Sequence, residues 1–323
     1  SRNKEMEQYL LNIYKIPYID RRVGSKNIIG KFLYMLIAEY LIFRKALKFK
    51  PDLFLSFGSI YPAHASFLLK KPHIAFDDTE HSTEQYKLYS SFTEVVLTPS
   101  CFTKDLGIKQ IRFDGYMELC YLHPKRFTAD TSVLDLLGVK QDEKYVIMRF
   151  VSWNASHDIG QSGLNTEKKH EIVEELSKYA KVFISSEGEL PEDLKKYQIK
   201  IPPEKMHHAL AFATLFVGEG ATMASECACL GTPAIYVNSL TAGTLEEQER
   251  YGLLFGFRNS DGVLEKSIEL LNTPNLKQEY QQRRQKMLSD KIDVTAFMVW
   301  FVENYPESAK IMKENPDYQW RFR

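Results

Sequence analysis

The chain has 323 residues, 44% of them hydrophobic and 26% charged, and its 42 Lys and Arg balance 42 Asp and Glu. This length predicts two domains, and this apolar content excludes a disordered chain. A net charge of zero argues against a nucleic-acid-binding protein, because such proteins carry a basic excess. The four cysteines are too few for a disulfide scaffold and lack zinc-site spacing, so we expect free thiols in a reducing cytosol.

The first part of the chain alternates helices with short apolar strands. The pattern predicts helices over 3–14, 29–49 and 61–70 and strands over 17–19, 53–57, 73–76 and 95–98. No apolar run reaches about 20 residues, so no transmembrane span is expected. The chain starts without Met and enters a helical pattern at once, as if an upstream segment were missing.

The second part repeats this rhythm. Strands are predicted over 145–150, 181–184, 215–217 and 234–237, and helices over 167–180, 203–213, 222–230, 260–272 and 293–304. Asp293 is the expected N-cap of the last helix. Short apolar strands alternating with helices indicate parallel α/β sheets.

This order predicts two Rossmann-like α/β domains that face each other across a cleft. We expect an N-terminal, acceptor-side domain over 1–120, a linker over 121–138 and a C-terminal domain for the nucleotide-sugar over 139–290. The segment 291–323 would form a helix that crosses back to the first domain, followed by a tail.

The segment after the strand 215–217 is the strongest candidate for ligand binding. Gly218 and Gly220 would let the backbone approach a ligand, and the helix that opens at residue 222 would offer N–H groups to a diphosphate. Glu226, in the second turn, would reach ribose hydroxyls. The alternative is a strand–loop–helix corner in which the glycines serve packing only.

The spacing of Glu226, Leu230, Gly231 and Pro233 is similar to the nucleotide-sugar loop of GT-B glycosyltransferases and of non-hydrolysing UDP-N-acetylglucosamine 2-epimerases. The resemblance implies that Gly220, Ala221 and Thr222 face the diphosphate and that Glu226 contacts the ribose. Ser225 of the same helix is a further candidate for nucleotide binding. The epimerases carry Ser-Gly-Gly where this chain has Gly220-Ala221-Thr222.

More of the chain resembles the family called domain of unknown function 354, whose members are GT-B-like. The matching stretches are 76–81, 98–102, 149–158, 184–188, 230–234 and 291–295. The family typically begins with one more strand and helix, which carry a His-Pro-x-His turn. The resemblance therefore implies a first domain that lacks its first strand and helix.

Polar residues follow two further predicted strands. Asp77, Asp78, Glu80 and His81 come after the strand 73–76, where they would supply a general base or bind a divalent metal. The alternative is a polar loop that caps the next helix. His157 follows the strand 145–150 and would act as an acid or base, contact a phosphate, or simply lie exposed.

Ser185, Ser186 and Glu187 end the strand that starts at residue 181. They would line the base or sugar of the donor, although a turn with a capping Ser explains them as well. The helix 31–50 is both basic and apolar, which suits contact with a membrane surface or packing against the core.

The leading functional hypothesis is a glycosyltransferase-like enzyme that uses a nucleotide-sugar, a UDP-sugar by resemblance, and a lipid-linked or saccharide acceptor. It would act in the bacterial cytoplasm, at the inner face of the membrane, in surface polysaccharide or glycoconjugate synthesis, without a metal or other cofactor. One alternative is a UDP-N-acetylglucosamine 2-epimerase-like enzyme. Another is a non-catalytic binding protein with the GT-B fold.

Overall fold

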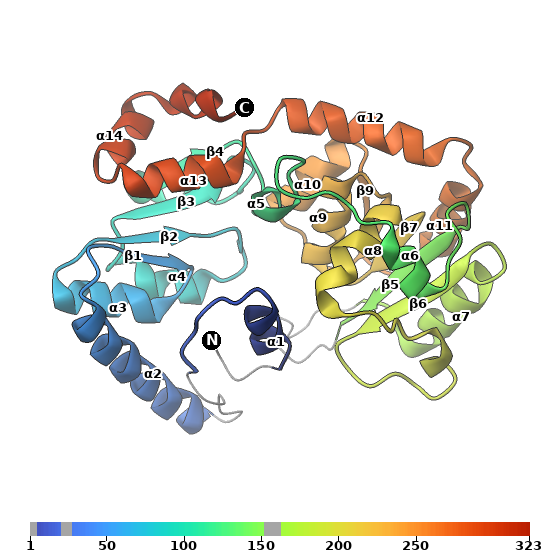
Figure 1. The fold of residues 1–323 in the computed structure, drawn as a ribbon, viewed down its shortest axis with the longest axis horizontal. Coiled ribbons are helices and arrows are strands. Elements are labelled where there is room, and N and C mark those ends of the chain that lie inside the picture. Colours follow the sequence, from blue (N-terminus) through green and yellow to red (C-terminus); the bar gives the residue numbers. More distant parts are fainter. Residues whose placement is uncertain (1–4, 21–27, 152–162) are drawn as a thin grey trace. The chain divides into compact units, whose positions relative to one another are not determined.

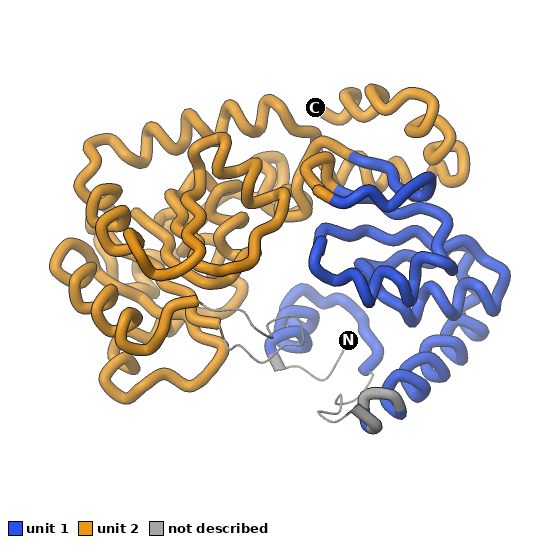
Figure 2. Tube along the Cα trace, turned by 180° about the vertical axis from the view of Figure 1, so that it is seen from behind, with its two compact units in different colours: residues 1–98, 104–112 blue, residues 99–103, 113–323 orange. Residues whose placement is uncertain are grey.

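The computed structural model describes residues 5–20, 28–151 and 163–323 (Figure 1). The chain divides into two compact units, coloured separately in Figure 2. Unit 1 comprises residues 1–98 and 104–112, and unit 2 comprises 99–103 and 113–323. His157 and the rest of 152–158 fall outside the described residues.

Unit 1 is built on a four-stranded sheet with strand order β1-β2-β3-β4, in which β1, β2 and β3 pair in parallel. Its strands are β1 (Phe54–Phe57), β2 (His73–Phe76), β3 (Val95–Pro99) and β4 (Gln110–Phe113), and its helices are α1 (Glu5–Ile13), α2 (Ile28–Phe49), α3 (Ile60–Leu69), α4 (Thr83–Ser90) and the 3-10 turn η1 (Gly107–Lys109). Ala63, Ala75, Tyr89 and Val96 form a buried cluster between helices and sheet. The strands β2 and β3 are buried almost throughout, as expected of parallel strands with both faces covered, whereas Leu55 and Phe57 of the edge strand β1 are about half exposed.

Most elements predicted for this part of the chain are confirmed, namely three helices and the strands over 53–57, 73–76 and 95–98. The strand predicted over 17–19 is wrong, because these residues adopt no regular structure. Ile16 and Ile19 are about half exposed, so the segment finds no apolar surface on which a strand would be stabilised. The helix α4 and the strand β4 were not anticipated.

Unit 2 contains a five-stranded, all-parallel sheet with strand order β6-β5-β7-β8-β9. The strands are β5 (Tyr145–Phe150), β6 (Lys181–Ser186), β7 (Leu215–Gly218), β8 (Ala234–Val237) and β9 (Leu254–Phe257). The helices are α5 (Leu119–Leu122), α6 (Ser132–Leu137), α7 (Thr166–Leu176), α8 (Met206–Phe212), α9 (Ala221–Leu230), α10 (Gly243–Arg250), α11 (Val263–Asn272), α12 (Leu276–Ser289), α13 (Val294–Glu303) and α14 (Glu307–Glu314), with 3-10 turns η3 (Lys195–Tyr197), η4 (Pro203–Lys205) and η5 (Pro316–Phe322).

All strands and helices predicted for this part of the chain are present, with shifts of a few residues at some ends. The segment expected to be a linker, 121–138, includes the end of α5 and all of α6. The elements α10, β9, α12 and α14 were missed. The polar sequence of α12 hides its helical period, because this helix buries only Leu276, Tyr280 and Met287.

The segment 291–295 anchors the start of α13. The carboxylate of Asp293 accepts a hydrogen bond from the Ala296 N–H at 3.0 Å, which confirms the predicted N-cap. Arg126 binds the two oxygens of the same carboxylate at 2.8 and 2.9 Å. Burial opposes ionisation of Asp293, but these contacts outweigh it and lower the pKa of the carboxyl. Among the described residues, no helix has the length and apolar character that crossing a bilayer requires.

Candidate functional site

The carboxyl edge of the unit 2 sheet collects the polar residues that follow β5, β6 and β7. Because these strands are parallel and adjacent, their carboxyl ends lie side by side. The register places Arg149 between Ser185 on one neighbouring strand and Gly218 on the other. Open α/β sheets bind ligands at this edge.

Arg149 links the ends of β5 and β6. Its guanidinium donates to Ser185 Oγ at 2.7 Å and to Glu187 Oε1 at 2.8 Å. The structure therefore brings two of the three predicted donor-side residues together around one cation. Ser185 and Ser186 are the last residues of β6, so neither lies in a separate capping turn.

Gly218 and Gly220 serve different purposes. A methyl group at Gly218 would lie 2.7 Å from Phe216 Cζ and 2.8 Å from Arg149 Cβ, so packing alone demands glycine there. At Gly220 the nearest atom would be Arg149 Cγ at 3.5 Å, an ordinary contact. Of the two glycines, only Gly220 has room for a methyl group beside its backbone.

The first turn of α9 is exposed at this edge. Gly220 is its N-cap and offers no side chain, and Ala221 and Thr222 are exposed. The first N–H groups of a helix have no partner within the helix, and the positive end of the helix dipole lies there. This turn is therefore chemically suited to an anion, with the Arg149 side chain next to Gly220.

Glu226 is buried in the second turn of α9. Its Oε1 accepts from the Tyr121 hydroxyl at 2.9 Å and lies 2.9 Å from His207 Nε2. Burial and the charge of Glu226 raise the pKa of Tyr121, so the phenol stays protonated and donates. Sequence reasoning found the carboxylate but missed both partners.

Ser225 lies away from the exposed tip. Only 2% of its surface is exposed, and its hydroxyl accepts from Gln248 Nε2 at 2.8 Å. This contact fixes α9 against α10, so Ser225 has a packing role in the structure. A nucleotide contact by this residue stays a prediction.

Glu219 is a buried carboxylate that sequence reasoning missed. It is 1% exposed, accepts from the Leu164 N–H at 2.8 Å and the Val151 N–H at 3.1 Å, and pairs with Lys169 at 3.0 Å. A charged residue directly between two glycines at a strand end was the available signal. Glu219 thus holds the chain after β5 and the start of the α7 segment to the end of β7.

The unit 1 sheet also ends in carboxylates. Asp77 is 6% exposed, accepts from the Thr79 N–H at 2.9 Å and from the Tyr89 hydroxyl, and has a pKa raised by burial. Burial, reinforced by the charges of Asp77 and Glu80, raises the pKa of Asp78 to about 6, although Thr79 donates to it at 3.1 Å.

The predicted carboxylates of unit 1 therefore do lie together after β2. Glu80 is buried and His81 is exposed. The helix α4 begins at Thr83 with Ser82 as its N-cap, so Asp77 and Asp78 do not cap it. Asp78 is the carboxylate that combines partial exposure with a pKa suited to proton transfer near neutral pH.

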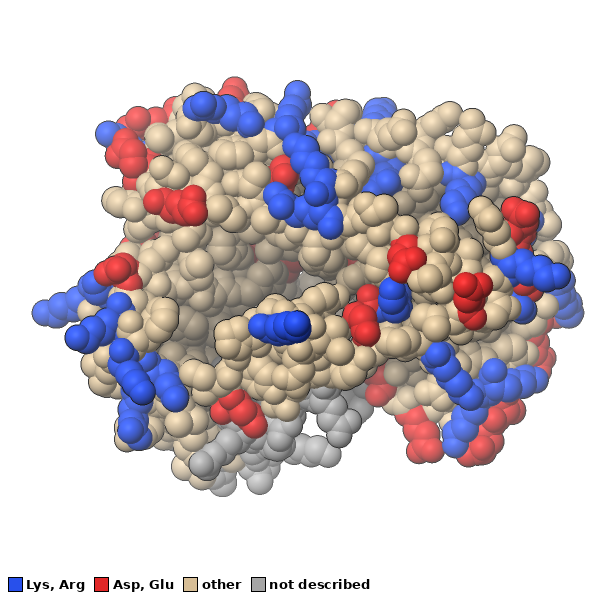
Figure 3. Space-filling view, in the orientation of Figure 1, with Lys and Arg blue, Asp and Glu red and all other residues tan. Residues whose placement is uncertain are grey.

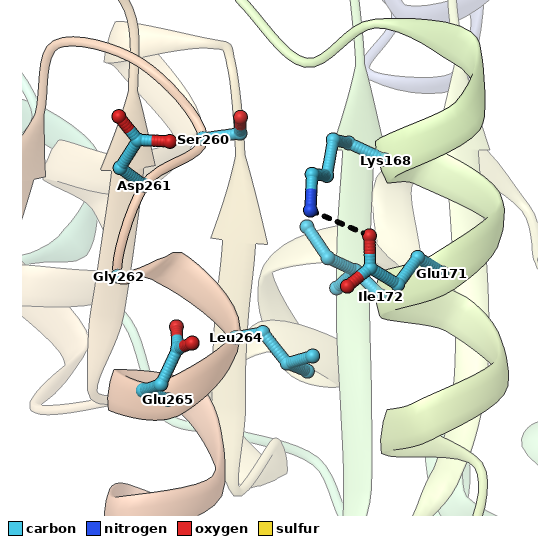
Figure 4. A pocket seen from close by; sticks show the side chains of 8 residues that line it. All are labelled: Lys168, Glu171, Ile172, Ser260, Asp261, Gly262, Leu264 and Glu265. Carbon is cyan, nitrogen blue, oxygen red and sulfur yellow. Dashed lines mark hydrogen bonds and ion pairs between the residues drawn. The ribbon is translucent and has the colours of Figure 1, made fainter.

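A separate pocket of about 230 Å³ lies in unit 2, between the starts of α7 and α11 (Figure 4). Lys168 Nζ there lies 2.7 Å from Glu171 Oε2, and Asp261 and Glu265 add two more carboxylates. This excess of negative charge disfavours a diphosphate. None of the predicted site residues lines the pocket, which is formed by Lys168, Glu171, Ile172, Ser260, Asp261, Gly262, Leu264 and Glu265.

The model of a family described as protein of unknown function (DUF354) matches residues 31–307. The chain belongs to this family. No curated protein matches its sequence.

Solved structures resemble the chain in fold. An S. aureus protein, MnaA with UDP, matches at 12% identity and a TM-score of 0.64, over 95% of this chain and 87% of its own. A UDP-GlcNAc 2-epimerase from Neisseria meningitidis, bound to UDP-GlcNAc, matches at 11% identity and a TM-score of 0.59, over 86% of this chain and 84% of its own. The glycosyltransferase SsfS6 from Streptomyces sp. SF2575, with thymidine diphosphate, matches at 13% identity and a TM-score of 0.50, over 85% of this chain and 75% of its own. The fold is thus GT-B-like, with two Rossmann-like α/β domains.

Proposed function

We propose that the protein is a nucleotide-sugar enzyme that binds a UDP-sugar on unit 2 and transfers the sugar to an acceptor hydroxyl. The observation that carries the proposal is the exposed first turn of α9, with Gly220 beside Arg149 and Glu226 one turn below. Neighbours of the same fold are named as complexes with UDP or UDP-GlcNAc, which supports this choice of ligand.

Each part of the site has a role in this proposal. The N–H groups of Ala221 and Thr222 and the guanidinium of Arg149 stabilise the diphosphate as it leaves, so no metal is needed. Both contacts of Glu226 use Oε1, so Oε2 is the atom that accepts from the ribose. Ser186 and Glu187 border the base or sugar.

Asp78 is the proposed base. It takes the proton of the acceptor hydroxyl while the acceptor oxygen attacks the anomeric carbon and the bond from that carbon to the diphosphate oxygen breaks, releasing UDP. With a pKa of about 6, Asp78 is mostly ionised at neutral pH yet basic enough to accept a proton. Asp77, with contacts from Tyr89 and Thr79, would position this loop.

The cellular setting is part of the same proposal. The acceptor is a saccharide or a lipid-linked saccharide, and the product serves surface polysaccharide or glycoconjugate synthesis in bacteria. All four cysteines are free thiols, which supports a reducing compartment such as the cytoplasm.

Calorimetry tests the nucleotide site, with UDP as ligand and GDP, CMP and TDP as comparisons. We expect selective UDP binding that Glu226→Gln weakens roughly 10- to 100-fold, because a charge-assisted hydrogen bond is lost. Glu175→Gln, on the surface of α7, is the matched control and should bind like the wild type. A folded wild-type protein that binds none of the four nucleotides would refute the proposal.

Epimerisation is the second candidate, because neighbours named 2-epimerases match with TM-scores between 0.56 and 0.62, whereas SsfS6 reaches 0.50. Incubation with UDP-GlcNAc in deuterated water separates the two reactions. Deuterium at the second sugar carbon without any acceptor would establish epimerisation and reject transfer. Selective binding without turnover on any UDP-sugar would instead indicate a non-catalytic binding protein.

A further inference from the structure

The helix α2 is apolar on two opposite faces. One face packs in unit 1, where Ala46 joins a buried cluster with Phe54 and Ala65, and Ala38 is fully buried. The opposite face has five large apolar residues, each between 46% and 59% exposed: Leu33, Leu36, Ile37, Tyr40 and Leu47. A surface helix normally presents polar residues on the side away from its core.

These five residues form one continuous stripe, which we call the α2 stripe. Their spacing of three, four or seven residues places them above one another along a helix. Arg44 continues the stripe between Tyr40 and Leu47, and its guanidinium carbon lies 5.7 Å from the centre of the Tyr40 ring. A contiguous exposed apolar surface of this kind marks an interaction site.

The stripe is flanked by positive charge without matching negative charge. Arg44, Lys45 and Lys48 are exposed near the end of α2, and Lys50 follows directly. Figure 3 shows Lys and Arg side chains grouped at the lower left, over the part of unit 1 that contains α2. The one acidic residue of the helix, Glu39, lies 2.7 Å from His64 of α3, on the side that packs in unit 1.

We propose that the α2 stripe docks on the surface of an anionic lipid bilayer, with the helix lying in the plane of the interface. Apolar side chains would enter the boundary between headgroups and acyl chains, and the basic residues would meet acidic headgroups. The helix lies on the membrane rather than spanning it, in agreement with its charged residues.

The charges favour lipid over a second copy of the chain. A self-complementary contact through the stripe would place Arg44 and Lys48 of both copies at the interface, with no carboxylate on the stripe to compensate them. Acidic headgroups supply that missing negative charge. This inference goes beyond the proposed reaction and does not depend on it, because it rests on α2 alone.

Sedimentation with lipid vesicles tests the apolar part of the proposal. The full chain should bind vesicles that contain phosphatidylglycerol and bind vesicles of pure phosphatidylcholine far more weakly. The double variant Leu36→Glu/Ile37→Glu should lose binding. Leu136→Glu, in α6, is the matched control, since Leu136 is 51% exposed and lies in unit 2.

A second variant tests the basic part. Lys45→Gln/Lys48→Gln should weaken vesicle binding roughly 30-fold, from about fivefold for each charge near an anionic surface. The control Lys310→Gln/Lys313→Gln, at two exposed positions of α14, should bind like the wild type. UDP calorimetry on the same variants should be unchanged, so failure here is distinct from failure of the nucleotide site.

Two outcomes would overturn the proposal. One is a folded wild-type chain that binds neither kind of vesicle. The other is self-association in analytical ultracentrifugation that Leu36→Glu/Ile37→Glu abolishes while vesicle binding is absent, which would make the stripe an interface between copies.

Discussion

Replacing Asp78 by Asn should stabilise unit 1 near neutral pH while abolishing turnover. The pKa of this carboxyl is raised from 3.8 to about 6, chiefly by burial and further by the charges of Asp77 and Glu80. The folded state therefore favours the neutral acid. Asn is nearly isosteric and is neutral at every pH, so it avoids the cost of ionising a partly buried carboxyl.

The sign and size of the effect follow from linkage. The free-energy cost of ionising Asp78 in the folded state is fully present above pH about 6, where Asp78 is ionised in both the folded and the unfolded chain. It vanishes well below pH about 4, where Asp78 is protonated in both. A shift from 3.8 to about 6 corresponds to about 3 kcal/mol at most. Because the amide cannot accept bonds as strongly as the carboxylate, we expect a net gain of about 1–2 kcal/mol.

Native-state hydrogen exchange is the suitable assay, because a chain with two units need not unfold in one step. The amides of β2 report on unit 1, since Asp77 N–H bonds the Leu97 carbonyl at 3.0 Å at the end of this strand. Their opening free energy in Asp78→Asn should exceed that of the wild type at about pH 7.5, and the gain should disappear towards pH 4. Asp52→Asn, at a side chain 96% exposed, is the control and should change nothing.

Two results would refute this reasoning. The first is an Asp78→Asn protein whose β2 amides are no better protected than those of the wild type at neutral pH. The second is a gain of equal size at both pH values, because a difference independent of protonation cannot come from ionisation of Asp78.

Further substitutions test the packing of unit 2 by urea unfolding. Gly218→Ala should lower the free energy of unfolding by about 1–3 kcal/mol through overpacking. Gly220→Ala should change this free energy little and instead impair UDP binding. Equal losses of stability in the two variants would contradict the different roles of the two glycines. Asp293→Ala should cost about 2–4 kcal/mol, because it removes a helix cap and leaves Arg126 unpaired. The difference in stability between the wild type and Asp293→Ala should shrink below pH about 4, because Asp293 has a lowered pKa in the folded chain and loses its charge there as the pH falls. Glu219→Gln should cost about 2–3 kcal/mol, since an amide cannot replace a buried carboxylate that accepts two N–H groups and faces a lysine, and an unchanged midpoint would refute this.

The sequence by itself determined the order of most elements and the fold class. Buried parallel strands are short unbroken apolar runs, and amphipathic helices repeat at three to four residues, so both are visible in a local window. The N-cap role of Asp293 could likewise be predicted from its position directly before an apolar helical segment. Where local signals failed, as in the polar helix α12 or the exposed segment 17–19, the outcome depended on which surface the rest of the chain offered.

Tertiary structure alone decided which side chains contact one another in the candidate site. Glu226 was recognisable, but Tyr121 lies 105 positions away and His207 lies on another helix. Arg149 meets Ser185 only because β5 and β6 pair in one register. Such pairs depend on which strands and helices become neighbours in the fold, and no local sequence pattern shows this. The backbone preferences that mark helices and strands, in contrast, act over a few residues and can be read from a short window.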